Sequence, residues 1–155
     1  MRLDLDTDQS IRIVAGDVLP RASSAMKPLL TRWTPGPAAG AQDGVLISVT
    51  DFTTARLRHS PDIIRSGLRL RKGWFAMSGA IGLWLWSLPL VSRSGSISVW
   101  HSDEDLRRFV ALPLHVEIMK RNRSRGSLRS TSWQTEDFSR AQVLERALAW
   151  IASGP

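Results

Sequence analysis

Cysteine is absent from the 155 residues of this chain, and so is tyrosine. The first absence excludes a disulfide framework, a thiolate metal site and a cysteine nucleophile. The second excludes a tyrosinate ligand and a phenolic acid. Histidine, which occurs three times, and the carboxylates are the side chains left for metal binding or proton transfer.

The chain also lacks a long hydrophobic run. Its N-terminus carries aspartates where a secretory signal needs a basic segment followed by an apolar one. The most apolar stretch, residues 76 to 91, is interrupted by Gly79, Gly82 and Pro89 and is shorter than the roughly 20 residues of a membrane-spanning helix. We therefore expect a cytoplasmic protein without membrane insertion.

Charge of one sign dominates, with a formal net charge of +7. Such a balance permits contact with nucleic acid, a membrane surface or an anionic ligand. The cations are spread over several segments, and no glycine-rich phosphate loop, zinc-finger spacing or aromatic RNA-binding signature accompanies them. Nucleic acid is therefore not an expected partner.

Length and composition predict one domain over residues 1–155, because 43% hydrophobic and 23% charged residues is an ordinary globular balance. Residues 34 to 44 have the proline and glycine content of a linker. This linker ends an N-terminal extension (1–43). The extension is followed by a core (44–134) and a C-terminal helix (135–155). Within the extension we predict a strand at 10 to 15 and a helix from 24 to 33, kept short by Pro28.

Alternating apolar residues predict the strands of the core, and periodic apolar stripes between capping signals predict its helices. The second strand is apolar on both faces, with Ile81, Leu83 and Leu85 on one side and Trp84 and Trp86 on the other. The predicted elements are strands at 45–52, 80–88, 96–101 and 128–133, and helices at 61–71, 102–121 and 137–153.

Helix starts are well marked in the sequence. Ser60, Pro61 and Asp62 supply a cap, a first-turn proline and an early acid. Ser102 followed by acids resembles a capping box, and Pro113 should kink or restart the second helix.

The order strand, helix, strand, strand, helix, strand predicts an α+β protein with the ferredoxin-like βαββαβ fold and a four-stranded antiparallel sheet. Two helices cover only one face of such a sheet, which would leave Trp84 and Trp86 exposed on the other. Burying a large aromatic side chain contributes about 1.5 to 3 kcal/mol, so the face should be covered. We expect a two-fold partner, hence a homodimer, with the N-terminal segment as the alternative cover.

The stretch from Gly95 to Trp133 resembles a known family. It has a serine-rich strand ending in Val99-Trp100, an acidic helix start, and then Pro113-Leu114-His115. With the glycine-containing strand around Gly82, this is similar to the spheroidene monooxygenase-like branch of the dimeric α+β barrel superfamily, which includes antibiotic biosynthesis monooxygenase-like proteins. The likeness covers residues 45 to 133.

This resemblance implies a small oxygenase, or a related redox or lyase enzyme, acting on an apolar or aromatic substrate between the sheet and its helices. Some relatives bind haem through a histidine on the second helix, whereas others need no cofactor. His115 matches that histidine by position. It is thus the candidate catalytic residue and the candidate ligand of haem iron, with Arg121 as a partner for the propionates.

His115 shares its helix side with apolar residues, where a neutral imidazole could ligate iron or act as a base. The alternative is a histidine held by a backbone carbonyl near the Pro113 kink. His101, at the end of a strand, is a second candidate base, although a structural role fits it as well. Trp84, Trp86, Trp100 and Met119 are candidate substrate contacts, for which plain core packing is the alternative.

The sequence therefore supports three hypotheses. The first is a haem-dependent monooxygenase-like enzyme with His115 as axial ligand. The second is a cofactor-free oxygenase or cyclase of an aromatic or polyketide-like substrate, with His115 or His101 as general base. The third is a ligand-binding module without catalytic activity.

Overall fold

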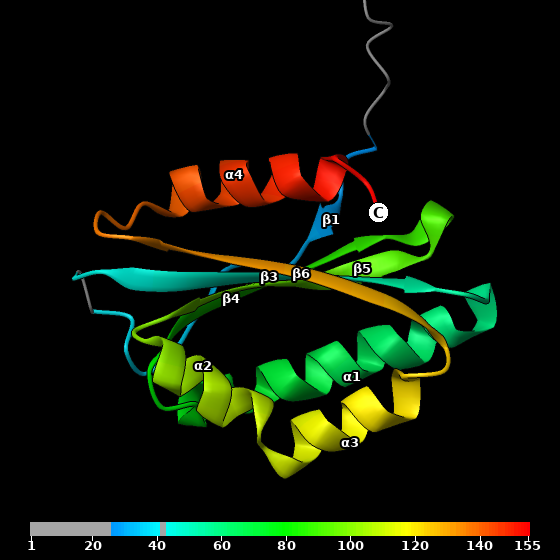
Figure 1. Cartoon of the computed structure of the whole chain (residues 1–155), viewed down its shortest axis with the longest axis horizontal. Coiled ribbons are helices and arrows are strands. Elements are labelled where there is room, and N and C mark those ends of the chain that lie inside the picture. The colour runs from blue at the N-terminus through cyan, green and yellow to red at the C-terminus, as the bar shows by residue number, and fades with distance from the viewer. Residues whose placement is uncertain (1–25, 41–42) are drawn as a thin grey trace, which may run out of the picture.

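The computed structural model describes residues 26–40 and 43–155, and it consists of one antiparallel sheet between helices (Figure 1). The core elements follow the predicted order. Three short 3-10 helices, Leu57–His59, Trp74–Ala76 and Pro89–Val91, connect them. The strands are β1 (Leu29–Leu30), β2 (Thr34–Pro35), β3 (Val45–Thr54), β4 (Ala80–Leu88), β5 (Arg93–Trp100) and β6 (Gly126–Thr135), and the helices are α1 (Ser60–Lys72), α2 (Asp103–Val110), α3 (Pro113–Asn122) and α4 (Arg140–Ala152).

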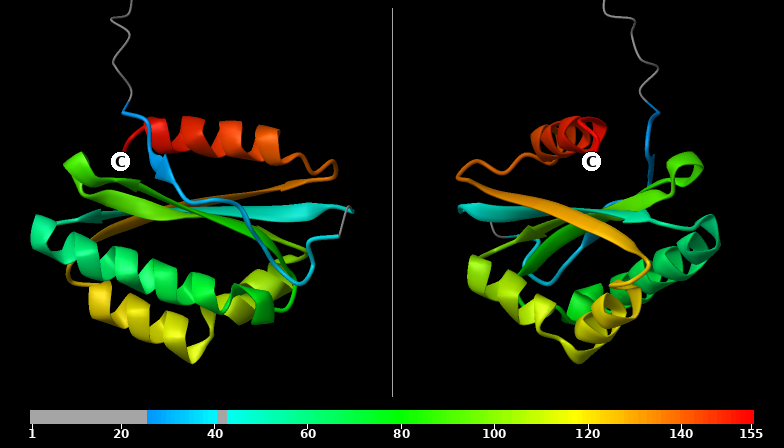
Figure 2. Two further views of the ribbon diagram at one scale, coloured as in Figure 1. Left: turned by 180° about the vertical axis from the view of Figure 1, so that it is seen from behind. Right: turned by 45° about the vertical axis from the view of Figure 1, so that its right-hand side comes forward.

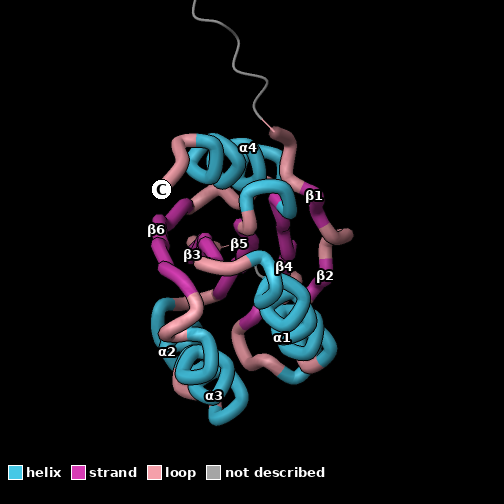
Figure 3. The backbone as a smooth tube through the Cα atoms, turned by 90° about the vertical axis from the view of Figure 1, so that its right-hand side faces the viewer, coloured by secondary structure: helices cyan, strands magenta, loops and turns pink. Residues whose placement is uncertain are grey.

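The four long strands lie in the order β4-β5-β3-β6, and each pairs antiparallel with its neighbours. Helices α1, α2 and α3 lie together on one side of the sheet, and α4 lies on the other (Figures 1 and 3). This confirms the predicted α+β class and ferredoxin-like fold.

Local signals place the helix boundaries. The Ser102 hydroxyl accepts a hydrogen bond from the Asp105 backbone N–H at 3.2 Å, as a capping box requires. Helix α2 ends at Val110 and α3 begins at Pro113, so the predicted restart is confirmed. Ser60 is not the cap of α1 but its first residue, and its hydroxyl lies 3.2 Å from that of Thr54.

The predicted helix at 24 to 33 is wrong for the residues that the structure describes. Leu29 and Leu30 instead pair with β4 as a short strand, and β2 pairs with β4 further along (Figure 2). The free edge of β4 offers backbone hydrogen bonds to this segment, and Pro28 disfavours a helix through it. The predicted strand at 10 to 15 lies outside the described residues.

A bulge between Ala80 and Gly82 changes the predicted face of one residue. Ile81 belongs to the core cluster on the α4 side with Trp84, rather than to the side of Leu83. Gly82 lets an indole approach, because a Cβ there would collide with the ring of Trp33. Trp33 consequently packs on Trp84, with ring centroids 4.3 Å apart.

Helix α4 covers the face of the sheet that the predicted fold leaves open. Val143, Ala147 and Ile151 are buried against the apolar side chains of β3, β4 and β5, and Trp84 and Trp86 are buried with them. The tryptophans that predicted a partner subunit are therefore covered within the chain, by the C-terminal helix rather than by residues 1–43 alone. The homodimer stays a prediction, but an uncovered face with exposed tryptophans is no longer a reason for it.

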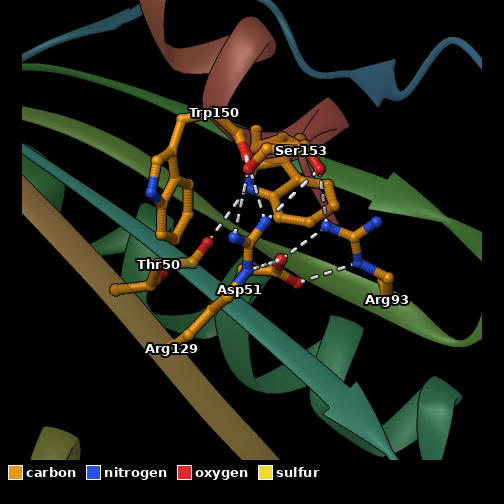
Figure 4. A network of polar contacts seen from close by, with 8 residues as sticks. Thr50, Asp51, Arg93, Arg129, Trp150 and Ser153 are labelled. Atoms are coloured by element: carbon orange, nitrogen blue, oxygen red, sulfur yellow. Dashed lines mark hydrogen bonds and ion pairs between the residues drawn. The ribbon is translucent and has the colours of Figure 1, made fainter. Parts of the chain in front are cut away.

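A buried ion network fastens the end of α4 to the sheet (Figure 4). Asp51, only 1% exposed, accepts hydrogen bonds from Arg93 and from Arg129 Nε at 2.7 Å. The two guanidinium groups also donate to main-chain carbonyls of the last turn of α4, Arg93 to Ile151 at 2.7 Å and Arg129 to Trp150 at 3.0 Å. Cations at a helix C-terminus are favoured by the helix dipole, so the extra positive charge is partly offset.

None of the described helices is long and apolar enough to cross a bilayer. The cytoplasmic location stays a prediction.

Candidate functional site

A cavity of about 1250 Å³ separates the sheet from helices α1, α2 and α3. It lies where the sequence predicts a pocket between the sheet and its helices. The cavity is partly open to solvent, and a space of this size between a sheet and its helices needs a cause. The cause is the kind of side chain that the sheet presents on this face.

The middle of the cavity floor is made of hydroxyl side chains. On β3, β5 and β6 the central positions that point away from α4 are serine or threonine, where an ordinary two-layer fold carries large apolar groups. Phe52 and Leu128 lie at one end of these rows, and Leu83 and Leu85 of β4 complete the floor. Small polar side chains neither reach the helices nor favour dry contact with them. The hydroxyl residues of the floor are Ser48 and Thr50 on β3, Ser94, Ser96 and Ser98 on β5, and Ser130 and Ser132 on β6.

Part of this floor is satisfied by the protein itself. The hydroxyls of Thr50 and Ser96 lie 2.9 Å apart, and Ser98 accepts a hydrogen bond from Trp100 Nε1 at 2.9 Å. The other floor hydroxyls make no hydrogen bond within the described residues. These unpaired groups are Ser48 and Ser94, both half-buried, and Ser130 and Ser132 on the edge strand. The floor therefore opens toward β6 and has hydrogen-bonding capacity to offer a ligand.

The roof of the cavity is apolar. Helices α1, α2 and α3 contribute Ile63, Leu70, Phe109, Val116 and Ile118 to its lining. The contrast between this roof and the hydroxyl floor suits a molecule with one apolar side and one oxygen-bearing side.

His115 lines the cavity from α3, half-buried, with its ring 4.9 Å from that of Phe109. Its Nδ1 lies 3.1 Å from the carbonyl oxygen of Val110, the residue that ends α2. A carbonyl only accepts hydrogen bonds, so Nδ1 carries the proton and Nε2 of the neutral ring keeps its lone pair. The backbone-held histidine and the cavity histidine, which the sequence presents as alternatives, are thus the same residue.

Burial lowers the pKa of His115 below the ordinary value of 6.5, and the hydrogen bond to Val110 partly opposes this shift. Desolvation disfavours the charged imidazolium, which is the usual effect of an apolar surrounding on histidine. His115 is therefore neutral at pH 7 and can accept a proton at Nε2.

Trp74 adds an unpaired donor beside the cavity. It is 1% exposed and lines the cavity, and its Nε1 is the buried side-chain polar atom of the described residues that has no hydrogen-bond partner. It is not among the site residues predicted from the sequence, because no local pattern distinguishes it from a core tryptophan. The nitrogen is closed off from the cavity although other atoms of the ring line it, and an unpaired buried donor of this kind costs about 1–3 kcal/mol.

Four predicted site residues are not tryptophans, and two of them line the cavity whereas two do not. His115 and Met119 both line the cavity from α3. His101 does not line it, because it lies exposed at the end of β5 with its Nδ1 3.9 Å from Asp105. Arg121 also lies outside, on the outer side of α3, where it pairs with Glu117 at 3.0 Å.

The three predicted tryptophan contacts serve mainly as core. Trp84 is buried on the α4 side. Trp86 borders the cavity, but its indole belongs to the core on the α4 side and donates to the Thr50 carbonyl at 3.1 Å. Trp100 is fully buried against Trp74, behind the cavity wall. Alternation correctly placed Trp84 and Trp86 on a shared face, which is the face opposite to the cavity floor.

The residues that line the cavity can be compared with the needs of a haem group. His115 would be the axial ligand through Nε2, and Lys120 and Arg123, which both line the cavity, would pair with the propionates. Arg121, predicted for that role, lies outside the cavity and pairs with Glu117 instead. In the described part of the chain, no group of three or more histidine and carboxylate side chains is arranged to hold a metal ion.

No protein-family model matches the sequence, and no curated protein does. Solved structures do match the fold. A candidate monooxygenase of Lactobacillus acidophilus has a TM-score of 0.55 at 14% identity over 68% of this chain, which spans 48% of that protein. A candidate antibiotic biosynthesis monooxygenase of Deinococcus radiodurans has a TM-score of 0.54 at 11% identity, over 61% of this chain and 95% of that one. A ferredoxin-fold protein of Listeria monocytogenes related to such enzymes has a TM-score of 0.52 at 16% identity, over 72% and 65%.

These similarities place the chain, by fold, with the ferredoxin-fold proteins that resemble antibiotic biosynthesis monooxygenases. The ferredoxin-like fold that the resemblance implies is confirmed, and membership of the superfamily stays a prediction. Nothing in these structures distinguishes the spheroidene monooxygenase-like branch, which stays a prediction.

Proposed function

We propose that the chain is an oxygenase that works without a bound cofactor, with His115 as general base on a small molecule held in the cavity. The observation that carries this proposal is the geometry of His115. Its Nδ1 is tied to Val110 and it lines a large cavity, so a neutral ring has its Nε2 lone pair free for a ligand.

The chemistry needs a substrate with an activated CH₂ group. Nε2 of His115 takes one proton from that carbon, and the resulting carbanion is the reductant of molecular oxygen. The overall reaction converts CH₂ and O₂ into C=O and H₂O, so one oxygen atom enters the product and the other leaves as water. The four electrons lost by carbon are the four that O₂ accepts.

The cavity walls support this reaction beyond the base. The apolar roof limits water around the carbanion, and the hydroxyl floor can hold oxygens of the substrate. A haem-dependent enzyme is the second candidate, because His115 would be the axial ligand and the cations that line the cavity, Lys120 and Arg123, would pair with the propionates. A non-catalytic binding module uses the same cavity and differs from this proposal only in turnover.

The test uses anthrone, whose CH₂ is acidic, and follows O₂ uptake together with anthraquinone formation above the uncatalysed rate. We expect wild-type protein to catalyse the reaction and His115→Gln to lose about 10²- to 10⁴-fold, the range that general-base catalysis contributes. His101→Gln is the matched control, because His101 lies outside the cavity, and it should retain wild-type turnover.

The pH profile sharpens this test. Because the pKa of His115 is lowered below 6.5, the protein-dependent rate should be level above pH 6.5 and should fall as the pH drops through the lowered pKa. Equal rates for wild type and His115→Gln would remove the proposal. A Soret shift on haem titration that is lost in His115→Gln would replace it with the haem-dependent enzyme.

A further inference from the structure

Three connections between elements lie together at one end of the sheet, on the right in Figure 1 and facing the viewer in Figure 3. They run from β3 to α1, from β4 to β5 and from α3 to β6. Backbone hydrogen bonds hold them side by side, from the Thr54 N–H to the carbonyl of Ser92 at 2.9 Å and from the Ala55 N–H to the carbonyl of Arg125 at 2.8 Å. We call this surface the loop end, and it comprises residues 54–60, 88–93 and 122–126.

Large apolar side chains protrude from the loop end. Leu90 is 87% exposed and Leu57 is 67% exposed, each in a short 3-10 helix between elements, and Val91 is exposed beside Leu90. Leu29, also exposed, lies next to them, because β1 pairs with β4 at Ser87, just before the helix that contains Leu90. Scattered apolar residues are normal on a protein surface, whereas a group of them on adjacent loops marks a contact surface.

Positive charge surrounds these side chains. Arg56 and Arg58 flank Leu57 in the sequence, both are exposed, and neither has a carboxylate within ion-pair distance among the described residues. Arg125 adds a third guanidinium at the loop end. The pKa of His59 is lowered below 6.5 by desolvation and by the positive charges of these three arginines, so the charges act on one place.

Most acids of the described residues at the ends of the sheet lie at the opposite end. There the start of β3 lies beside the ends of β5 and β6. At the loop end, Asp62 is engaged by Arg65 at 3.3 Å and by Arg125 at 3.6 Å. The charge along the molecule is therefore polarised, which would turn the loop end toward an anionic surface. The acids of the opposite end are Asp43, Asp103, Glu104, Asp105, Glu136 and Asp137.

We propose that the loop end docks on the surface of an anionic lipid bilayer. Arg56 and Arg58 pair with the negative charges of the lipid headgroups, and Leu57 and Leu90 rest in the boundary between headgroups and acyl chains. The contact is peripheral, so it needs no helix that crosses the bilayer, and none of the described helices could cross one.

The combination of charge and apolar surface favours a bilayer over two other occupants. A second copy bound by a two-fold axis through the same surface would place the arginines of both copies opposite one another. Nucleic acid would pair with the arginines through its phosphates, but a phosphate backbone has no use for exposed leucines. An anionic bilayer is the partner that satisfies both kinds of side chain.

Co-sedimentation of the full chain with lipid vesicles tests this proposal. Vesicles that contain about 30% phosphatidylserine should bind the chain about tenfold more tightly than vesicles of phosphatidylcholine alone, and added salt should shrink the difference. Leu57→Ser and Leu90→Ser should each weaken binding to the anionic vesicles about fivefold, through lost apolar contact. Arg56→Gln and Arg58→Gln should each weaken it about fivefold, through lost charge.

The opposite end of the sheet offers matched controls. Phe75 is 67% exposed, as Leu57 is, but it lies just before the start of β4, which pairs with the end of β5. Arg107 is an exposed arginine of α2 at the same end. Phe75→Ser and Arg107→Gln should therefore bind the vesicles as the wild type does.

A fluorescent label can report whether the loop tip enters the lipid. Because the chain has no cysteine, Leu90→Cys can carry a single environment-sensitive fluorophore. Its emission should shift to the blue on anionic vesicles, whereas the same label at Phe75→Cys should not respond. This measurement separates entry of the loop tip from adsorption by charge alone.

Equal binding to the two kinds of vesicle, equal effects of Phe75→Ser and Leu90→Ser, or an unchanged emission at Leu90→Cys would each overturn the inference. Binding to double-stranded DNA that the leucine variants leave intact, without binding to vesicles, would assign the loop end to nucleic acid. A dimer that depends on Leu57 and Leu90, without binding to vesicles, would assign it to a second copy. None of these measurements depends on turnover or on His115, so the docking and the proposed reaction fail separately.

Discussion

The two faces of the sheet differ in nearly every physical respect although they alternate along the same strands. On β3, Val45, Ile47 and Val49 are buried under α4, whereas Ser48 and Thr50 face the cavity. The first face is packed with aliphatic and indole groups. The second carries small hydroxyls over its middle and leaves a space of about 1250 Å³, and a smaller apolar cluster around Trp74 and Trp100 fills one end of it.

This difference separates stability from ligand binding. Most apolar burial lies under α4, at about 25 cal/mol per Å² of buried apolar surface, and the smaller cluster around Trp74 and Trp100 adds to it on the other face. The hydroxyl positions of that face give up such a contribution, which a purely structural face would not do. A sheet that forgoes packing on one face, with a histidine across the gap, has the organisation of a binding site.

Asp51→Asn should cause the largest loss in the free energy of unfolding, because it breaks the network that holds α4 on the packed face. The substitution leaves Arg93 and Arg129 close together without their anion. Breaking a buried ion pair in this way costs about 3–5 kcal/mol. Urea unfolding followed by tryptophan fluorescence should show the lower free energy of unfolding, with dye binding to the uncovered face.

The control is Asp103→Asn, which removes an exposed pair with Arg107 on α2. Such surface pairs contribute at most about 1 kcal/mol, so this variant should unfold close to wild type. If both substitutions had equal effects, the network would not be what fastens α4.

A reciprocal exchange on β3 tests the two faces directly. Val49→Ser places a hydroxyl in the packed face and should cost about 2–4 kcal/mol, from lost apolar burial and an unpaired polar group. Ser48→Val, at the adjacent position, faces the cavity and should change the free energy of unfolding by no more than about 0.5 kcal/mol.

For ligand binding, the order of the two variants should be reversed, with Ser48→Val having the larger effect. Ser48→Val removes a floor hydroxyl and should weaken the binding of anthraquinone, the product of the anthrone reaction, by about threefold, the size of one neutral hydrogen bond. Destabilisation by Ser48→Val as large as that by Val49→Ser would mean that both faces are core.

The smallest effect should be the pH dependence that His115 adds to stability. Its pKa in the folded chain is lowered by burial, so below pH 6.5 the unfolded chain binds more protons there than the folded chain. The contribution of His115 is therefore complete above pH 6.5 and is lost as the pH falls toward the lowered pKa. His115→Gln should reduce the loss of stability between pH 7.5 and pH 5.5, as measured by urea unfolding at the two pH values.

Much of the fold could be predicted from the sequence because its signals are local. Alternation located the four long strands, and the Ser102 cap and Pro113 fixed the boundaries of α2 and α3. His115 at the cavity was predicted from its apolar helix side and from the resemblance. These features are encoded by residues that are close together along the chain, so a pattern of neighbours is enough to find them.

The missed features depend on contacts between distant segments. Nothing near Val143 or Ile151 indicates that α4 crosses back over the sheet, and Asp51 meets Arg129 only because β6 returns beside β3. The hydroxyl floor did have a signal in the sequence. Ser48, Ser96 and Ser130 each belong to a run of hydroxyl residues at every second position, and three such runs in one sheet indicate a polar interior face.

The anchoring of α4 has a consequence for how this protein can change over time. Arg93 and Arg129 donate to main-chain oxygens at Trp150 and Ile151, and every amino acid carries such an oxygen. Replacing the side chain of Trp150 or Ile151 leaves both acceptors in place, so these hydrogen bonds do not depend on residue type, whereas the buried packing of Ile151 does. Inserting one residue in the preceding turns would instead rotate the helix end by about 100° and carry those oxygens out of reach, so the anchor constrains the length of α4.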